Sequence, residues 1–346
     1  MTAALLPFGW SDRWSALFAS ATEDRTSTRP GRVVRHDGVA VLVAQESGTE
    51  QLPVLASVDP VPVVGDWVVV DTGSGAVVDV LARTSLLRRQ DPDGGEQPLV
   101  ANLDVLLVVC GLDRPVKPGR IQRSTALAWD AGAVPVVVLT KADLSDDAEA
   151  VVAEVEAGNP GVDVILCSSV DGRGVEAVER LIVGRTIVLL GESGAGKSTL
   201  ANVLLGEEVA ATGEVREGDA KGRHTTTRRE LHVLPTGGVL IDTPGLRAVG
   251  LWVDPEAVAE SFDDIEELAT GCRFNDCAHA GEPGCAVAAA VESGELAPER
   301  LEAWHSIRRE VESAARRADE HARRSYERKF GRAVKDAVER KRGDRG

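Results

Sequence analysis

Several hallmarks of membrane and secreted proteins are missing from this sequence of 346 residues. Its apolar runs are far shorter than the ~18 residues that a membrane-spanning helix needs. Residues 1–6 contain no basic side chain of the kind that begins a secretory signal. Internal repeats and low-complexity tracts are also missing. We therefore expect a cytoplasmic chain that does not contact a membrane.

Cysteine is scarce and unevenly placed, with five residues in the whole chain. An odd number of cysteines without a secretory signal argues against a disulfide framework. Cys110 and Cys167 each follow an apolar run, which is typical of small buried core residues. The other three cysteines lie close together between positions 272 and 285.

The charge balance is acidic overall, with a formal net charge of −16. Residues 305–346 depart from this, because they hold 14 Lys or Arg against 8 Asp or Glu. Such a chain is not expected to bind nucleic acid over its whole surface, but a basic C-terminal arm can contact a phosphate backbone. A solvated helix with interleaved charges is an equally good interpretation of the arm.

The apolar pattern divides the chain into parts. Short β-branched runs between turn residues, within 31–82, predict a small closed barrel. From 103 to 242, buried-type strands alternate with helical segments, which predicts an α/β domain with a doubly wound parallel sheet. Beyond 254 the pattern is helical apart from the cysteines. We expect an N-terminal segment and barrel over 1–89, a linker over 90–100, the α/β domain over 101–250 and a helical domain over 251–346.

One predicted strand ends in the phosphate-loop pattern G-x-x-x-x-G-K-[ST] and opens a helix. Glycines let backbone N–H groups surround phosphates, and the helix N-terminus favours negative charge. Lys197 is expected to reach the β- and γ-phosphates, and the Ser198 hydroxyl to bind Mg²⁺. The expected phosphate-binding residues are Gly191, Glu192, Ser193, Gly194, Ala195, Gly196, Lys197, Ser198 and Thr199.

Two strand ends upstream carry patterns of guanine recognition. Thr140-Lys141-Ala142-Asp143 resembles the base-reading motif N-K-x-D, whose carboxylate accepts hydrogen bonds from guanine N1–H and its amine and so rejects adenine. Ser168 and Ser169 fit the loop that backs the base with main-chain N–H groups. Thr140 replaces Asn and removes one amide, which we expect to lower affinity more than specificity.

A D-x-x-G pattern, from Asp242 to Gly245, follows the phosphate loop. Asp242 is expected to hold Mg²⁺ and the Gly245 N–H to sense the γ-phosphate. The base-reading loop therefore precedes the phosphate loop, the reverse of ordinary GTPases. Circular permutation would leave the sheet unchanged, since domain termini usually lie near one another. The segment after D-x-x-G then leads directly into the helical domain, which should respond to the bound nucleotide.

The hydrolytic residues look incomplete. Leu246 stands where small GTPases place the Gln that orients water, and leucine can neither donate nor accept a hydrogen bond. His224 has suitable chemistry, although a phosphate-adjacent or RNA-facing role explains it equally well. One of Thr225, Thr226 and Thr227 is expected to close on Mg²⁺. Because these residues are incomplete, we expect slow intrinsic turnover that a partner accelerates. The expected catalytic residues are His224, Lys197, Asp242 and Gly245.

Four potential metal ligands follow within 14 residues: Cys272, Cys277, His279 and Cys285. Three thiolates and one imidazole form the tetrahedral set that Zn²⁺ prefers, and four protein ligands leave no open position for catalysis. We therefore predict one structural zinc ion, which fixes a loop too polar and glycine-rich to fold alone.

Taken together, the permuted order, the segment G-R-H-T-T-T at 222–227 and the cysteine cluster resemble the ribosome small-subunit-dependent GTPase A family (RsgA, also called YjeQ). Gly65-Asp66-Trp67-Val68 and Glu282-Pro283-Gly284-Cys285 are similar to that family's sequences, and the resemblance covers nearly the whole chain. It implies an α/β, circularly permuted P-loop GTPase domain between an N-terminal OB-fold barrel and a C-terminal zinc-binding helical domain. It also implies Mg²⁺-dependent GTP hydrolysis in late maturation of the 30S ribosomal subunit. The protein would bind the rRNA of this subunit, and the subunit would activate hydrolysis. We expect a monomer that binds GTP and GDP.

Two other functions stay compatible with the sequence. One is a P-loop kinase that uses ATP on a small molecule, for which a preference for ATP would be diagnostic. The other is a nucleic-acid-binding scaffold whose bound nucleotide is never hydrolysed.

Overall fold

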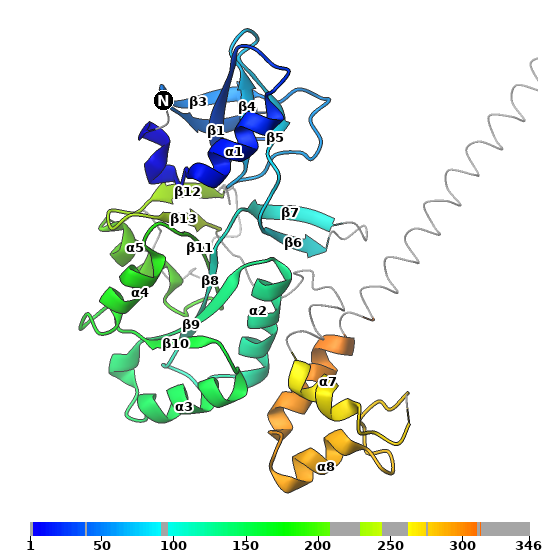
Figure 1. The fold of residues 1–346 in the computed structure, drawn as a ribbon. Helices are drawn as coiled ribbons and strands as arrows, with labels where there is room; N and C mark the ends of the chain where they lie inside the picture. Colours follow the sequence, from blue (N-terminus) through cyan, green and yellow to red (C-terminus); the bar gives the residue numbers. More distant parts are fainter. Residues whose placement is uncertain are drawn as a thin grey trace, which may run out of the picture.

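The structure is a computed structural model that describes residues 3–38, 40–90, 96–207, 229–243, 262–274, 276–309 and 312. Its described part comprises a barrel, an α/β domain and a smaller helical lobe beside helix α2 (Figure 1). Positions 1–2, 39, 91–95, 208–228, 244–261, 275 and most of 310–346 fall outside this description.

The N-terminal barrel contains five antiparallel strands around a valine-rich core. The first strand pairs with the second and fourth, the second with the third and the fourth with the fifth. A bridge between Val54 and Val77 brings the end of the third strand to the fifth and closes the barrel. The elements are η1 (Ala3–Phe8), α1 (Asp12–Ala21), β1 (Thr28–His36), β2 (Ala40–Gln45), β3 (Gly48–Pro53), β4 (Trp67–Asp71) and β5 (Ala76–Val80).

The segment expected to be a linker contains a strand. β6 (Leu86–Gln90) pairs with β7 (Glu96–Ala101) in a separate antiparallel ribbon. Leu99, Val100 and Ala101 are buried, and removing their apolar surface from water stabilises the pairing of the two strands. Pro98 and the lack of a β-branched run hid this strand in the sequence.

The α/β domain is built on five parallel strands in the order β10-β9-β8-β11-β13, with the antiparallel strand β12 beside β13. The predicted alternation of strands and helices is confirmed. β12 was not predicted, because its sequence E-L-H-V lacks a β-branched run. The elements are β8 (Val105–Gly111), α2 (Pro118–Asp130), β9 (Val134–Thr140), η2 (Ala142–Leu144), α3 (Ala148–Gly158), β10 (Asp163–Leu166), α4 (Val175–Ile182), β11 (Thr186–Gly191), α5 (Lys197–Leu205), β12 (Glu230–Val233) and β13 (Val239–Asp242).

The barrel and the α/β domain share one continuous sheet. β1 pairs antiparallel with β12 in the register Arg35↔Glu230, so the two domains form a single 11-stranded sheet. Arg35 also pairs with Glu230 through its side chain at 3.4 Å and with Asp37 at 3.1 Å. Strand pairing therefore sets the relative position of the domains.

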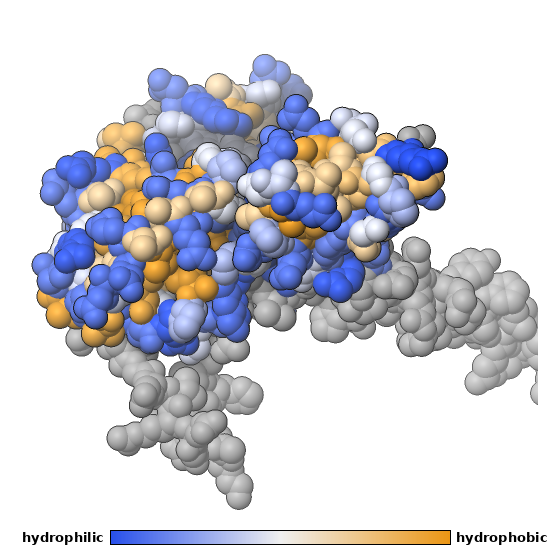
Figure 2. All heavy atoms as spheres, turned by 90° about the horizontal axis from the view of Figure 1, so that it is seen from below, coloured by the Kyte–Doolittle hydropathy of each residue, from blue (hydrophilic) through white to orange (hydrophobic). Residues whose placement is uncertain are grey.

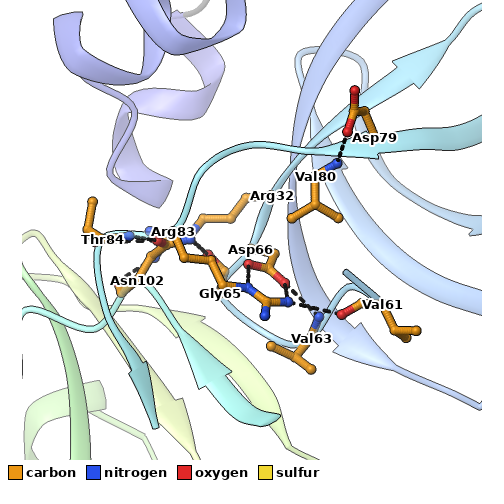
Figure 3. A network of polar contacts seen from close by, with 10 residues as sticks. All are labelled: Arg32, Val61, Val63, Gly65, Asp66, Asp79, Val80, Arg83, Thr84 and Asn102. Carbon is orange, nitrogen blue, oxygen red and sulfur yellow. Dashed lines mark hydrogen bonds and ion pairs between the residues drawn. The ribbon is translucent and has the colours of Figure 1, made fainter. Parts of the chain in front are cut away.

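A buried arginine lies where the barrel meets the α/β domain (Figure 3). Arg32 of β1 is 2% exposed and donates to the Gly65 carbonyl at 3.3 Å and to the Thr186 hydroxyl at 2.8 Å. Burial lowers its pKa to about 10, against the opposing effect of Asp104, so it stays charged at neutral pH. Next to it, Asp66 accepts two hydrogen bonds from Arg83, at 2.8 and 2.7 Å.

The C-terminal lobe contains α7 (Asp263–Ala269), α8 (Ala286–Ser293) and a helical stretch at 298–309. Trp304 and Ile307 of the helical stretch are buried, at 3% and 4% exposure. Arg300 pairs with Asp264 and donates to the Gly158 carbonyl of α3 at 3.2 Å, which attaches the lobe to the α/β domain. The basic arm lies mostly outside the described residues.

Among the described residues, no helix is long and apolar enough to cross a bilayer. Figure 2 shows the molecule from below, where hydrophilic and hydrophobic residues are interspersed over two adjoining lobes.

Candidate nucleotide and metal sites

The predicted nucleotide-binding loops follow the carboxyl ends of four strands, β9, β10, β11 and β13. These strands are parallel neighbours within one sheet, apart from β8 between β9 and β11. Their carboxyl ends therefore meet at one edge, which is where ligands bind in open α/β sheets. The fold brings together residues that lie up to about 100 positions apart in the chain.

The loop between β11 and α5 has the geometry of a phosphate loop. Gly194 and Gly196 adopt left-handed backbone conformations, with φ of 77° and 88°, which disfavour other residues. A side chain at Gly191 would collide with the Val109 carbonyl of the neighbouring strand. Lys197 Nζ donates to the carbonyls of Gly191 and Glu192, at 2.9 and 2.6 Å. The lysine therefore folds across the loop, with Ser198 in the first helical turn behind it.

Thr140 connects the base-reading loop to the phosphate loop. Its hydroxyl donates to the Ala195 carbonyl at 2.6 Å and lies 3.3 Å from the Cys110 carbonyl, and the residue is 3% exposed. A Cβ at Gly196 would stand 3.1 Å from the same hydroxyl. Sequence reasoning treated Thr140 as the loss of an amide and missed this connection, which depends on contacts between distant loops.

The base-reading and base-backing loops are also joined. The Ser168 hydroxyl donates to Asp143 Oδ1 at 2.6 Å, and the Ala142 N–H donates to the Cys167 carbonyl at 3.1 Å. Ser168 is fully buried, whereas Asp143 is exposed. Lys141 has a left-handed backbone conformation with φ of 58°. Ser168 thus holds one oxygen of the Asp143 carboxylate in place.

Asp242 ends β13 and is partly buried, and burial raises the pKa of its carboxyl. Asp242 and Ser198 both carry oxygen atoms, the type of ligand that Mg²⁺ prefers. The remaining predicted residues of this edge lie outside the described residues: His224, Thr225, Thr226, Thr227 and Gly245. Thr199 is exposed on α5, and Ser169 is partly exposed beside Ser168.

The sequence analysis did not single out Asp113, which follows β8. Its carboxylate pairs with Lys141 Nζ at 2.9 Å and with Arg114 Nη2 at 3.1 Å. These neighbours hold the pKa of Asp113 below its usual range, Arg114 having the larger effect. The signal in the sequence is weak, because an exposed Asp-Arg dipeptide is common on loops.

The four predicted metal ligands converge in the C-terminal lobe. Their ligand atoms all lie within 4.8 Å of one another, in a group that could hold a metal ion. Cys272 Sγ is 3.9 Å from Cys285 Sγ, near the ~3.8 Å between sulfurs bound tetrahedrally to one zinc ion. His279 Nδ1 is 3.6 Å from Cys272 Sγ and 3.5 Å from Cys285 Sγ.

Surrounding contacts orient these ligands. Cys285 caps α8, since its sulfur accepts the Ala288 N–H at 3.4 Å. Glu282 accepts the N–H groups of Ala278 and Ala280 at 3.1 and 2.8 Å and shapes the loop between the ligands. His305 donates to the His279 carbonyl at 3.2 Å, which connects the cluster to the helical stretch at 298–309.

Comparison with known proteins identifies close relatives. The sequence model of the RsgA GTPase family matches residues 80–252. The chain is 44% identical to the small ribosomal subunit biogenesis GTPase RsgA of Streptomyces avermitilis, and the match covers 99% of this chain and 96% of that protein.

Solved structures agree with this similarity. YjeQ from Thermotoga maritima matches with a TM-score of 0.62 and 28% identity, over 82% of this chain and 98% of that one. YloQ, described as a circularly permuted GTPase, has the same fold, with a TM-score of 0.59, 24% identity and coverage of 83% and 96%. The permuted order inferred from the sequence is therefore confirmed.

Proposed function

This chain belongs to the RsgA GTPase family, and we propose that it couples GTP hydrolysis to late maturation of the 30S ribosomal subunit. Family membership makes it a GTP-hydrolysing enzyme. The observation that best supports the role of this edge is the Thr140–Ala195 hydrogen bond, because it holds a base-reading loop and a phosphate loop in one site. The relatives' names supply the connection to the small subunit.

We assign nucleotide contacts to the loops at this edge. Asp143, oriented by Ser168, accepts from the guanine N1–H and amine, and the Lys141 stem covers the base face. The backbone N–H groups of residues 191–196 surround the phosphates, and Lys197 exchanges its loop carbonyls for phosphate oxygens. Ser168, Ser169 and Ala142 back the base.

Mg²⁺ fits the oxygen donors available here, and Ser198 and Asp242 would hold it. When bound with GTP, this ion supplies positive charge that neutralises the β- and γ-phosphates. We propose that His224 orients the attacking water. One of Thr225 to Thr227 would bind Mg²⁺, and the Gly245 N–H would contact the γ-phosphate. Leu246 cannot orient water, so intrinsic turnover is slow and the subunit accelerates it.

For the cysteine cluster, we propose one structural zinc ion held by Cys272, Cys277, His279 and Cys285. The distance between the sulfurs supports a tetrahedral site. The four ligands all come from the protein, so the site would be closed. The ion would hold the 271–286 loop against α8 and the helical stretch at 298–309.

We further propose that the chain works in the cytoplasm as a monomer and binds rRNA through two surfaces. The five-stranded barrel, which we assign to the OB type, offers groove contacts, and the basic arm neutralises backbone phosphates. The domain bounds that we propose are 1–89, 90–100, 101–250 and 251–346, and β7 (Glu96–Ala101) lies almost wholly within the second of these.

The two alternatives are less favoured. An ATP-dependent kinase does not explain a guanine-type base loop or membership of a GTPase family. A non-hydrolysing scaffold conflicts with the same membership.

The direct test is hydrolysis of GTP and ATP by the purified chain, with and without 30S subunits, in Mg²⁺ and physiological salt. We expect slow turnover of GTP alone, strong stimulation by 30S subunits, and little turnover of ATP. Lys197→Ala should abolish the stimulated reaction. Turnover of ATP equal to that of GTP, or no effect of the subunit, would contradict the proposal.

A further inference from the structure

The loop between β8 and α2 places an arginine over the phosphate loop. Arg114 Nη2 lies 3.1 Å from where a Cβ of Gly194 would stand, so the guanidinium covers a glycine at the middle of that loop. Arg114 also lines a small hollow together with Gly191, Glu192 and Ala195. An arginine from a separate segment therefore lies directly beside the backbone that surrounds the phosphates.

This arginine is held in place by its neighbour. Asp113 Oδ2 is 3.1 Å from Arg114 Nη2 and 2.9 Å from Lys141 Nζ, so one carboxylate connects the arginine to the base-reading loop. A Cβ at Gly111 would stand 2.6 Å from Asp113 Oδ1, which shows how tightly the carboxylate packs against the end of β8. Arg114 therefore lies between the loop that reads the base and the loop that holds the phosphates.

The acidic residue of the phosphate loop has a different partner. Glu192 forms an ion pair with Arg120, from the first turns of α2. The Arg114 side chain is 45% exposed, and its contact with Asp113 uses one end of the guanidinium. A guanidinium has five donors in a planar fork, so donors stay available for an anion.

We propose that Arg114 binds the phosphate chain of the guanine nucleotide as a second cation beside Lys197, and that Asp113 is its positioning residue. This inference rests on the proposed use of this edge as the GTP site. Charge-assisted hydrogen bonds from a guanidinium to phosphate oxygens are strong and directional. Because GDP and GTP share the α- and β-phosphates, the contact strengthens the binding of both and has little effect on the hydrolytic step.

The test measures the affinity of the full chain for GDP and GTP by titration calorimetry, and its steady-state GTP turnover with 30S subunits. For Arg114→Ala we expect affinity for both nucleotides to fall roughly 10- to 100-fold, as for the loss of a hydrogen bond to a charged group. The KM for GTP should rise while kcat stays within about twofold. Arg114→Lys should recover part of the affinity, and Asp113→Asn should lose part of it. Arg180→Ala, an exposed arginine on α4 paired with Glu176, is the matched control and should change nothing.

GDP affinity of Arg114→Ala within twofold of the parent would overturn the proposal, as would a fall in kcat without a change in affinity. Lys197→Ala separates this failure from that of the proposed function. If Lys197→Ala loses nucleotide binding but Arg114→Ala does not, this inference alone fails. If neither variant loses binding, the phosphate site is not at this edge and both fail. Thermal melting of each variant checks that it is folded.

Discussion

Arg32 donates a hydrogen bond from Nη2 to the Thr186 hydroxyl over 2.8 Å. Thr186 is the first residue of β11, the strand that ends in the phosphate loop, and Arg32 belongs to the first strand of the barrel. The same guanidinium donates to the Gly65 and Phe8 carbonyls. A single buried cation thus joins the barrel, the N-terminal segment and the first residue of β11.

Replacing this cation should destabilise the whole molecule. Arg32→Met fills part of the volume but leaves buried carbonyls without donors, so we expect the free energy of unfolding to fall by about 2–4 kcal/mol. Chemical denaturation measures the change. Arg25→Met is the matched control, since Arg25 pairs with Asp79 at the surface with 40% of its side chain exposed, and its loss should cost less than about 1 kcal/mol. Equal effects of the two substitutions would show that Arg32 does not join the domains.

Thr140→Val should weaken nucleotide binding without altering base preference. Valine has nearly the same shape but cannot donate to the Ala195 carbonyl, so the two loops lose their connection. We expect affinity for both GDP and GTP to fall about five- to tenfold, the value of one buried hydrogen bond. Titration of both nucleotides checks this, and Thr140→Ser, which keeps the hydroxyl, should retain most of the affinity. A Val variant that binds as the parent does would contradict the role of this hydroxyl.

Asp143→Asn should shift base preference from guanine toward xanthine. An amide at this position presents a donor to the base edge, which suits the carbonyl of xanthine and not the amine of guanine. Competition between GTP and XTP in the hydrolysis assay measures the shift. Ser168→Ala, which removes the hydroxyl that orients Asp143, should weaken GTP binding but keep guanine preferred. Unchanged preference in the Asn variant would place the base reader elsewhere.

Removal of metal should loosen one region selectively. With a strong chelator, we expect hydrogen exchange to speed up in residues 271–286 and at the start of α8, while the barrel and the α/β domain keep their protection. Metal analysis should find one zinc ion per chain, and Cys285→Ser should lose it. Cys110→Ser, outside the cluster, should keep the ion. Unchanged exchange in 271–286 after complete metal removal would rule out a structural role.

Local patterns in the sequence predicted most of the fold and the strand ends at which the candidate site residues lie. β8, β9, β11 and β13 are short apolar runs, and the phosphate loop lies within a few residues of one of them, so spacing was enough to identify it. The four cysteine and histidine positions were equally plain, because a metal site depends on residue type and spacing within 14 residues.

The features that sequence did not predict depend on contacts between distant segments. β12 and β7 lack the pattern of a buried strand and form because a neighbouring strand pairs with them. Thr140 reads as a substitution in a motif, yet its hydroxyl bonds to a carbonyl 55 positions away. Arg32 and Asp113 belong to no motif, and their roles follow from what the fold places beside them.

The pairing of β1 with β12 gives the permuted chain a mechanical property. β12 lies between the barrel on one side and β13, which carries Asp242, on the other. Because hydrogen-bonded strands move together, a displacement of the barrel is passed through β12 to β13. If the proposed partner, the small ribosomal subunit, binds the barrel, it restrains β1. That restraint is transmitted through β12 to β13 and so to Asp242.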